Sequence, residues 1–224
     1  SNNGVLLSYN EKTDSFDNLM PDDFHETYFK SITGFYEDEK DLWVSTTNGM
    51  YAYDDQKKKF AQHPAMSDSI MQFFISSVER DKFGHFLCGY YLGVILFDEN
   101  GKHLEEYDEL LSFGSIVSQI VKLDEQHFLV SSFVDGVWII SIEDDGSIAK
   151  PVRHKTPFRN VTSVLRDSRG EFWFGTGGQG LWKATFDGKD FVFEKVESVN
   201  FEKEELQIKP LKGKDGKLVL VPEV

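Results

Sequence analysis

The chain has 224 residues, of which 40% are hydrophobic and 28% are charged, as is typical of a folded protein of one compact domain. The net charge of −14 at pH 7 disfavours binding to nucleic acid, because such binding requires basic groups that face the phosphates. The same charge disfavours an acidic membrane surface, and the chain has no run of about 18 apolar residues that would span a membrane.

The N-terminal segment and the cysteine content give limited information on cellular compartment. Cys88 is the only cysteine, so the redox environment is not indicated by disulfides. The chain begins at Ser1 without an initiator Met and without the basic and apolar regions of a signal peptide. We therefore expect an excised fragment or a mature domain.

A pattern of two apolar runs separated by a short loop recurs along the chain. The chain opens on the second half of this pattern, complete copies follow at 41–54, 84–98, 127–140 and 170–184, and the first half returns at 216–221. Each second run begins at a glycine, and successive glycines are 45, 44, 43 and 44 residues apart. This even spacing predicts an internal repeat of about 44 residues. The repeated glycines are Gly4, Gly49, Gly93, Gly136 and Gly180.

Each copy is also flanked by further strand and turn signals. The preceding apolar segments are Ile32–Phe35, Ile75–Val78, Val117–Val121 and Val161–Leu165. The turns that follow the second run include Asn100-Gly101, Asp145-Gly146 and Asp187-Gly188, and these dipeptides favour hairpins because both positions tolerate positive φ. A fourth strand is expected at Phe60–Gln62 and at Phe191–Glu194. Each unit is therefore predicted to contain four short strands joined by hairpins, without a helix.

Four-stranded units that repeat every 40–45 residues predict a β-propeller of antiparallel blades, an all-β fold. The second and third strands are apolar at nearly every position, as expected when both faces of a strand are buried. We expect a single domain over residues 1–224 with about five blades' worth of repeats. Either residues 4–20 pair with residues 205–221 and close a five-blade ring, or the chain is a fragment of a larger ring, for example of seven blades.

The repeat resembles the two-component regulator propeller repeat. Its core is Gly-x-Leu/Phe-Trp-Val/Phe-Gly/Ser-Thr, followed by a short loop, Gly-Leu/Val/Met and a strand that ends near Asp. Asp167–Lys183 and Asp41–Asp54 match best. The resemblance extends along essentially the whole chain, although Leu87-Cys88 and Leu129-Val130 replace the Trp-containing strand in the two middle units.

This resemblance implies the extracytoplasmic, periplasmic sensor region of a hybrid histidine kinase and response regulator. It implies an oligosaccharide or similar polar ligand, a signal to a kinase elsewhere in the polypeptide, and a homodimer formed through the full-length receptor. The domain itself is expected to be neither an enzyme nor a cofactor-binding protein. Family members usually carry two seven-blade propellers and a β-sandwich before the membrane, which exceeds the length of this chain.

The candidate ligand-binding residues lie on one predicted face, where the loops between second and third strands meet the linkers between units. Loops on a rigid scaffold commonly carry binding residues. Aromatic rings stack on sugars, and carboxylate, amide and guanidinium groups bond to sugar hydroxyls. The alternative is that the aromatic members pack between blades. The loop candidates are Tyr90, Tyr91, Phe133, Asp135 and Gln179, and the linkers add Arg159 together with His25, Glu26, Tyr28 and His154.

Other motifs favour structural roles. The tryptophans Trp43, Trp138, Trp173 and Trp182 recur at strand positions, which predicts blade packing. Residues 175–180 fit G-x-G-x-x-G but precede a strand rather than a helix, so no dinucleotide site is expected. The six histidines lack zinc-motif spacing, and no metal is predicted, although histidines around a ring axis can converge. Cys88 is expected to be an inert buried residue.

Two other functions stay open from the sequence. One is a protein-interaction scaffold without a small ligand. The other is a propeller lyase or hydrolase, which would need a His or Tyr acid–base group near the axis, often with a metal.

Overall fold

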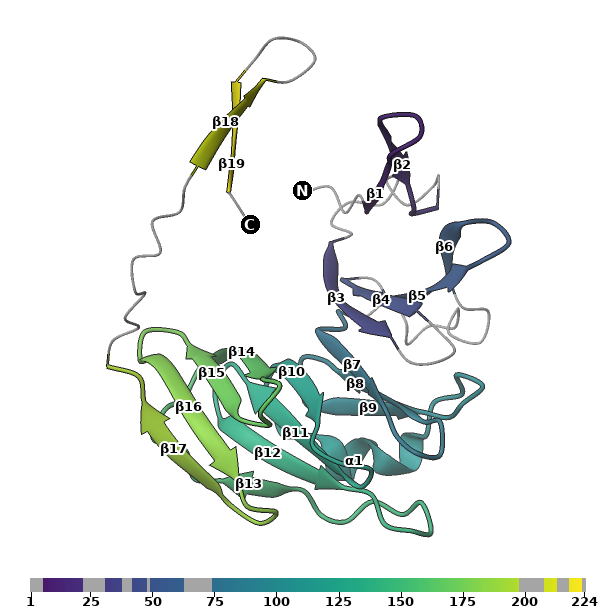
Figure 1. Cartoon of the computed structure of the whole chain (residues 1–224). Helices are drawn as coiled ribbons and strands as arrows, with labels where there is room; N and C mark the ends of the chain where they lie inside the picture. Colours follow the sequence, from purple (N-terminus) through teal and green to yellow (C-terminus); the bar gives the residue numbers. More distant parts are fainter. Residues whose placement is uncertain are drawn as a thin grey trace.

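In the part of the chain that it describes, the computed structural model is almost entirely β, with one short helical segment between β9 and β10 (Figure 1). This confirms the predicted all-β class. The structure describes residues 6–21, 31–37, 42–47, 49–62, 74–197, 208–212 and 218–222.

Short antiparallel sheets follow one another along the chain and surround a common centre (Figure 1). Four of them form the body of the structure, and the first strand of each lies nearest the centre. The first sheet consists of β3 (Ile32–Glu37), β4 (Leu42–Thr46), β5 (Gly49–Asp54) and β6 (Lys59–Gln62). The second sheet consists of β7 (Ser77–Arg80), β8 (Phe86–Gly89) and β9 (Val94–Phe97). The third sheet consists of β10 (Val117–Lys122), β11 (His127–Ser132), β12 (Gly136–Ser141) and β13 (Val152–His154). The fourth sheet consists of β14 (Val161–Arg166), β15 (Phe172–Thr176), β16 (Gly180–Phe186) and β17 (Phe191–Lys195).

The middle strands of the β7–β9 and β10–β13 sheets are largely buried on both faces, as predicted, whereas β16 of the last sheet is mostly half-buried or exposed. In β11, Phe128 and Val130 belong to a core cluster shared with Leu87 and Leu96 of the β7–β9 sheet. Leu129, between them, belongs to a different cluster, which is shared with the β14–β17 sheet. All five side chains are at most 1% exposed. Successive residues of one strand therefore pack against different neighbouring sheets, because side chains alternate across a strand.

The same alternation occurs in β8. Phe86 and Cys88 pack in a cluster with Trp43 and Met50 of the β3–β6 sheet, whereas Leu87 faces the β10–β13 sheet. Burying an apolar side chain of this size stabilises the fold by about 1.5–3 kcal/mol. The β7–β9 and β10–β13 sheets therefore depend on both of their neighbours for a large part of their stability.

The innermost strands lie side by side in separate sheets, and polar side chains form hydrogen bonds between them. Ser77 Oγ accepts a bond from the backbone N–H of Ile120 in the next sheet, at 3.0 Å. Gln119 Oε1 accepts a bond from the backbone N–H of Val164, one sheet further on, at 2.8 Å. Buried backbone groups that no strand ladder reaches thus gain partners from the adjacent sheet.

The repeated glycines adopt a conformation that only glycine tolerates well. Gly49, Gly93, Gly136 and Gly180 have φ values of 91°, 151°, 82° and 84°. A Cβ at Gly93 would also lie against the backbone carbonyl oxygen of Leu111. The spacing seen in the sequence therefore marks the positions at which each loop turns into its third strand.

Aspartates organise the turns at the opposite end of the sheets. Asp81 Oδ1 accepts hydrogen bonds from the backbone N–H groups of Phe83 and His85, at 2.9 and 2.8 Å. Asp167 Oδ1 likewise accepts hydrogen bonds from the backbone N–H groups of Arg169 and Glu171. Asp167 Oδ2 accepts a hydrogen bond from the indole N–H of Trp173. That indole bond is the main cause of a pKa below the ordinary value at Asp167. Several acidic residues of the repeat are therefore structural.

The β7–β9 sheet departs from the predicted four strands. In place of a fourth strand the chain forms a 3₁₀ turn, η4 (Glu105–Tyr107), and a short helix, α1 (Asp108–Leu111), and bridges β9 only at His103 and Ser112. The segment 105–111 contains Glu, Asp, Leu and Tyr but no β-branched residue, so it favours a helix over a strand. Leu111 is fully buried in the core cluster that also contains Leu87.

The terminal strands do not complete a shared blade in this structure. β1 (Leu7–Asn10) pairs with β2 (Ser15–Asn18), and β18 (Ile208–Lys212) pairs with β19 (Leu218–Pro222), as two separate two-stranded sheets. Both hairpins were predicted. The five-blade closure by their mutual pairing is not observed, and the ring is open between them (Figure 1).

We predict that Gly93→Ala destabilises the protein by about 3 kcal/mol, because it combines a strained φ with a clash against backbone atoms that cannot move independently. Gly188→Ala is the matched control, since its φ is 97° but no atom lies within 4 Å of the added Cβ. It should cost only about 1–2 kcal/mol. Urea unfolding of the two variants measures the difference, and equal losses would contradict the assigned packing.

Candidate functional site

The loops between second and third strands meet the linkers between sheets at one end of the structure, as predicted. Backbone hydrogen bonds join each loop to the linker beside it. The backbone N–H of Thr47 donates to the carbonyl oxygen of Ser31 at 2.9 Å, and that of Gly177 donates to the carbonyl oxygen of Asn160 at 2.8 Å. We call this end the loop face. Hydroxyl groups also close some of these loops, since Thr46 and Thr176 donate from Oγ1 to the carbonyl oxygens of Gly49 and Gly180 at 2.9 and 2.6 Å.

Two cavities flank strands β12 and β13 near the loop face. The first, here named the basic pocket, has a volume of about 410 Å³ and lies between the β10–β13 and β14–β17 sheets. Three of its residues are cations, and Phe158 closes its base with 1% of its surface exposed. Its lining residues are Asp135, Arg153, His154, Lys155, Thr156, Phe158 and Arg159.

Hydrogen bonds hold part of the basic pocket in place. Arg153 donates from Nη2 to Asp135 Oδ1 and from Nε to Asp135 O, both at 3.1 Å. His154 lies 3.5 Å from Asp190 and packs edge-on against the ring of Phe191. Asp135, Arg153 and His154 are thus engaged with protein partners. The cationic side chains of Lys155 and Arg159 are exposed.

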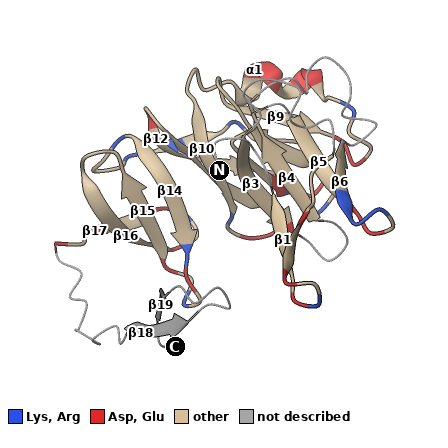
Figure 2. Cartoon of the chain, turned by 90° about the horizontal axis from the view of Figure 1, so that it is seen from above, with Lys and Arg blue, Asp and Glu red and all other residues tan. Residues whose placement is uncertain are grey.

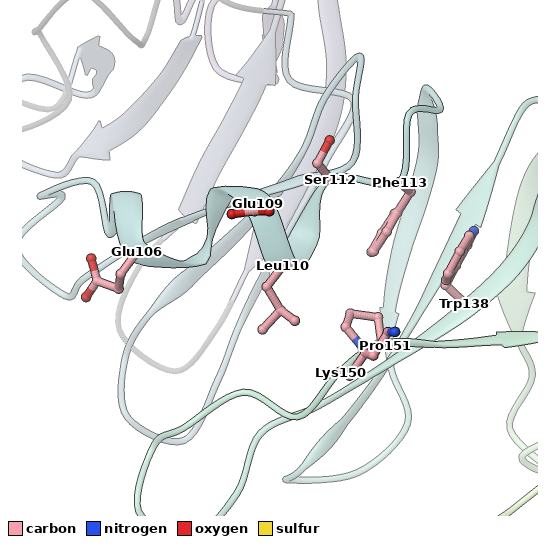
Figure 3. A pocket seen from close by; sticks show the side chains of 8 residues that line it. All are labelled: Glu106, Glu109, Leu110, Ser112, Phe113, Trp138, Lys150 and Pro151. Carbon is pink, nitrogen blue, oxygen red and sulfur yellow. The ribbon is translucent and has the colours of Figure 1, made fainter.

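The second cavity, here named the aromatic pocket, has a volume of about 550 Å³ and lies between η4–α1 and strands β12 and β13 (Figure 3). Its apolar side chains come from three parts of the chain, and carboxylates from η4 and α1 border it. Figure 3 shows Phe113 between Leu110 and Trp138, with Lys150 and Pro151 below them. The lining residues are Glu106, Glu109, Leu110, Ser112, Phe113, Trp138, Lys150 and Pro151.

The indole of Trp138 connects the two pockets. Phe113 stacks on it with ring centres 4.7 Å apart and an angle of 7° between the planes. The guanidinium of Arg153, which lines the basic pocket, lies 5.8 Å from the centre of the same ring. Phe113 of one pocket and Arg153 of the other thus both contact the indole of Trp138.

The η4–α1 segment makes this part of the molecule acidic, whereas the basic pocket is cationic. Glu105, Glu106, Asp108 and Glu109 follow one another closely, and α1 is coloured as acidic in Figure 2. The two pockets on either side of Trp138 therefore differ in charge. A ligand that reaches both would meet hydrogen-bond acceptors in one and cationic donors in the other.

Three of the predicted ligand-binding residues come together in the structure. Asp135 and Arg159 line the basic pocket, and Gln179 adjoins it, because its Oε1 accepts the backbone N–H of Arg159 at 2.8 Å. His154, predicted from the linker, lies in the same pocket.

The predicted aromatic residues lie apart from this group. Tyr90 is partly buried against the cluster of Trp43 and Phe86, so it belongs to the packing between blades. Burial and the charge of Asp108 raise its pKa above the ordinary value. Tyr91 and Phe133 are 49% and 37% exposed at loop tips and line neither pocket.

Some residues of the site were not predicted, and some predictions cannot be compared with the structure. Glu106, Glu109 and Phe113 were missed because the repeat predicts a strand where η4 and α1 occur. Arg153 in β13 and Lys155 in the following linker were missed because a lone cation carries no pattern. His25, Glu26 and Tyr28 lie outside the described residues.

The remaining motifs have structural roles. Residues 175–180 form the end of β15, a loop and the start of β16, so this glycine-rich segment opens no helix. Cys88 is fully buried, and burial raises the pKa of its thiol far above the ordinary value. Trp43 is 3% exposed in a core cluster and Trp182 packs against another, as predicted.

Over the residues with described positions, no group of three or more His, Cys, Asp or Glu side chains is arranged to hold a metal ion. The helices of that same part of the chain are all too short or too polar to cross a membrane.

Comparison with known families identifies one repeat directly. The model of the two component regulator propeller matches residues 157–178, which include the linker before β14, the strands β14 and β15, and the start of the following loop. This confirms the resemblance that the sequence predicted for this unit. Comparison with curated protein sequences finds no match.

Solved structures share the propeller fold. The extracellular domain of the putative hybrid two component system BT4673 from B. thetaiotaomicron has a TM-score of 0.59 at 14% identity, over 81% of this chain and 23% of that one. The extracellular domain of the putative hybrid two component system BT3049 from the same organism has a TM-score of 0.58 at 18% identity, over 100% of this chain and 33% of that one. The β-propeller domain of Cps50 (Swd1) from Myceliophteria thermophila has a TM-score of 0.54 at 15% identity, over 75% of this chain and 56% of that one.

The chain therefore spans about a quarter to a third of the two bacterial extracellular domains that it matches. At these identities the likeness establishes the fold, a β-propeller of four-stranded antiparallel sheets that is open in this structure.

An ionisable group on an innermost strand yields a prediction of pH dependence. Burial raises the pKa of Glu79 in β7 from 4.5 to about 7, against the opposing effect of the backbone N–H and the charge of Lys122. Because the native pKa is above the unfolded one, the folded state binds the extra proton, and stability should fall as pH rises from about 4.5 to about 7.

We predict that Glu79→Gln removes this fall, so that at pH 8 the variant is more stable than the parent protein by about 1–2 kcal/mol. Urea unfolding between pH 4.5 and 8 measures it. Replacement of the exposed Glu99 by Gln serves as the control and should leave the pH profile unchanged. Parallel profiles for the parent and Glu79→Gln proteins would show that Glu79 titrates normally.

Proposed function

We propose that this chain is the ligand-binding propeller of an extracytoplasmic two-component sensor and that it recognises an oligosaccharide at the aromatic pocket. The match to the two component regulator propeller and the likeness to extracellular domains of hybrid two component systems support the class of protein and its periplasmic location. In this role the domain performs no catalysis. Its ligand shifts the signalling state of a kinase elsewhere in the receptor by binding two conformations unequally.

The aromatic pocket is the observation that carries the choice of ligand. It combines the half-buried side chains of Leu110 and Phe113 and the buried Pro151 with the exposed residues Glu106 and Glu109. A sugar ring presents C–H groups on its faces and hydroxyls at its rim. The apolar surface matches the faces, and carboxylates accept hydrogen bonds from the hydroxyls.

The aromatic pocket lies where the chain departs from the four-stranded repeat. It exists because η4 and α1 replace the fourth strand of the β7–β9 sheet, and these elements supply Glu106, Glu109 and Leu110. The neighbouring sheet supplies Trp138 and Pro151 and follows the regular pattern. The departure from the repeat therefore creates a cavity that a regular four-stranded sheet would not form.

A protein-interaction scaffold is the second candidate, and the exposed apolar loop tips favour it. Tyr91, Leu92 and Val134 are 49%, 52% and 58% exposed on the loop face. Such residues contribute to protein interfaces when they form a continuous patch. A partner protein would then take the place of the oligosaccharide.

We predict that isothermal titration calorimetry against neutral and acidic oligosaccharides of two to six sugars identifies a ligand, and that Phe113→Ala weakens its binding at least tenfold. Loss of the ring removes the apolar platform of the pocket. Phe83→Ala is the matched control, because Phe83 is a partly exposed ring in a turn at the opposite face. This control should bind within twofold of the parent chain.

Two results would reject the oligosaccharide proposal. One is the absence of binding by any member of the panel, which would favour the scaffold. The other is equal affinity in the parent chain and Phe113→Ala, which would place the sugar outside the aromatic pocket.

A further inference from the structure

The basic pocket gathers positive charge in a chain whose net charge is −14. Its three cations, Arg153, Lys155 and Arg159, face a single lining carboxylate, Asp135, which is already paired with Arg153 at 3.1 Å. In the part of the chain that the structure describes, Lys155 and Arg159 form no ion pair. Two cations of the pocket are therefore not neutralised by the protein.

The backbone that carries these two cations is fixed in place. Between them, Thr156 Oγ1 donates to Phe158 O at 2.5 Å, and Phe158 is buried against the rings of Phe174 and Trp182. The backbone N–H of Arg159 is held by Gln179. A charged group that is positioned before its ligand arrives loses less conformational entropy on binding.

We propose that the basic pocket binds an anionic oxygen group, a carboxylate or a sulfate ester, carried by the ligand whose sugar occupies the aromatic pocket. The part of this proposal that concerns the sugar rests on the proposed function. Guanidinium and ammonium groups are the protein donors that suit such oxygens, and the planar fork of Arg binds two of them at once.

The two pockets adjoin the same indole ring, that of Trp138. Arg153 lines the basic pocket, and its guanidinium lies 5.8 Å from the centre of the Trp138 ring, which lines the aromatic pocket. A sugar placed against Phe113 therefore has the cationic pocket as its neighbour. This favours an acidic oligosaccharide over a neutral one.

The charge of the rest of the chain restricts the ligand further. The acidic η4–α1 segment and the overall net charge repel long polyanions, whose charges would extend beyond the pocket. A short ligand with one or two localised negative groups avoids most of this repulsion. The pocket thus fits a short acidic oligosaccharide better than an intact polyanionic chain.

Sodium sulfate tests the anion site without any assumption about the sugar. We predict saturable chemical-shift changes of backbone amides 153–159 in ¹⁵N-labelled protein at millimolar sulfate, with ionic strength kept constant by sodium chloride. The double variant Lys155→Gln/Arg159→Gln should bind sulfate at least tenfold more weakly. Lys12→Gln/Lys102→Gln is the control, because it removes the same charge from exposed lysines of hairpin turns outside the pocket, and it should bind within twofold of the parent.

Shift changes that grow linearly without saturation would overturn the proposal, and so would equal sulfate affinities in the parent and the Lys155→Gln/Arg159→Gln variant. A second titration tests whether the pocket recognises a carboxylate by comparing digalacturonate with its uncharged methyl ester. Selective binding of the acid form would assign the pocket to carboxylates. If sulfate fails to bind while a neutral oligosaccharide binds at Phe113, the anion site is wrong and the proposed sensor function stands.

Discussion

Burial of the middle strands between two neighbouring sheets is the constraint on which the rest of the structure depends. Phe128 and Leu129 are adjacent in β11 but pack into different clusters, one on each side of the sheet. Three of the core clusters each take buried residues from two neighbouring sheets. The hydrophobic free energy that holds the ring together is therefore located between the blades.

This arrangement explains why binding residues can be placed at the loop face. The loops between second and third strands begin and end in buried strands, and each is tied to an adjacent linker by a backbone hydrogen bond. The side chains of these loops are thus free to vary while their backbones stay fixed. The aromatic and basic pockets use this freedom differently, the first through a change of secondary structure and the second through charged side chains in a linker.

The sequence predicted the periodic part of the fold well, because its signals are local and repeated. A glycine with positive φ is needed at each loop, and continuous apolar runs are needed in strands with two buried faces, so Gly49, Gly93, Gly136 and Gly180 marked the units correctly. Departures from the repeat were harder to find. The four residues of α1 are too few for a helical period, and only their contact with Leu87 and Trp138 shows why they fold as they do.

The candidate site was predicted in part for the same reason. Asp135, Arg159 and Gln179 were identified because the topology places their loops and linker on one face. Tyr90 resembled them in sequence, but its ring turns toward the cluster of Trp43 and Phe86, and this depends on side-chain packing that a repeat pattern does not encode. The pairing of Arg153 with Asp135, which leaves Lys155 and Arg159 as the unneutralised cations, is likewise a tertiary property.

Double-mutant cycles test most directly whether the blades share their cores. The first cycle pairs Leu129→Ala with Phe174→Leu, two residues of the same cluster that lie in different sheets. The second cycle pairs Phe128→Leu with Phe174→Leu, two residues that belong to different clusters. We expect a coupling energy above about 0.5 kcal/mol for the first pair and additivity within about 0.3 kcal/mol for the second. Additivity in the first cycle, or equal coupling in both, would contradict the account of stacked blades.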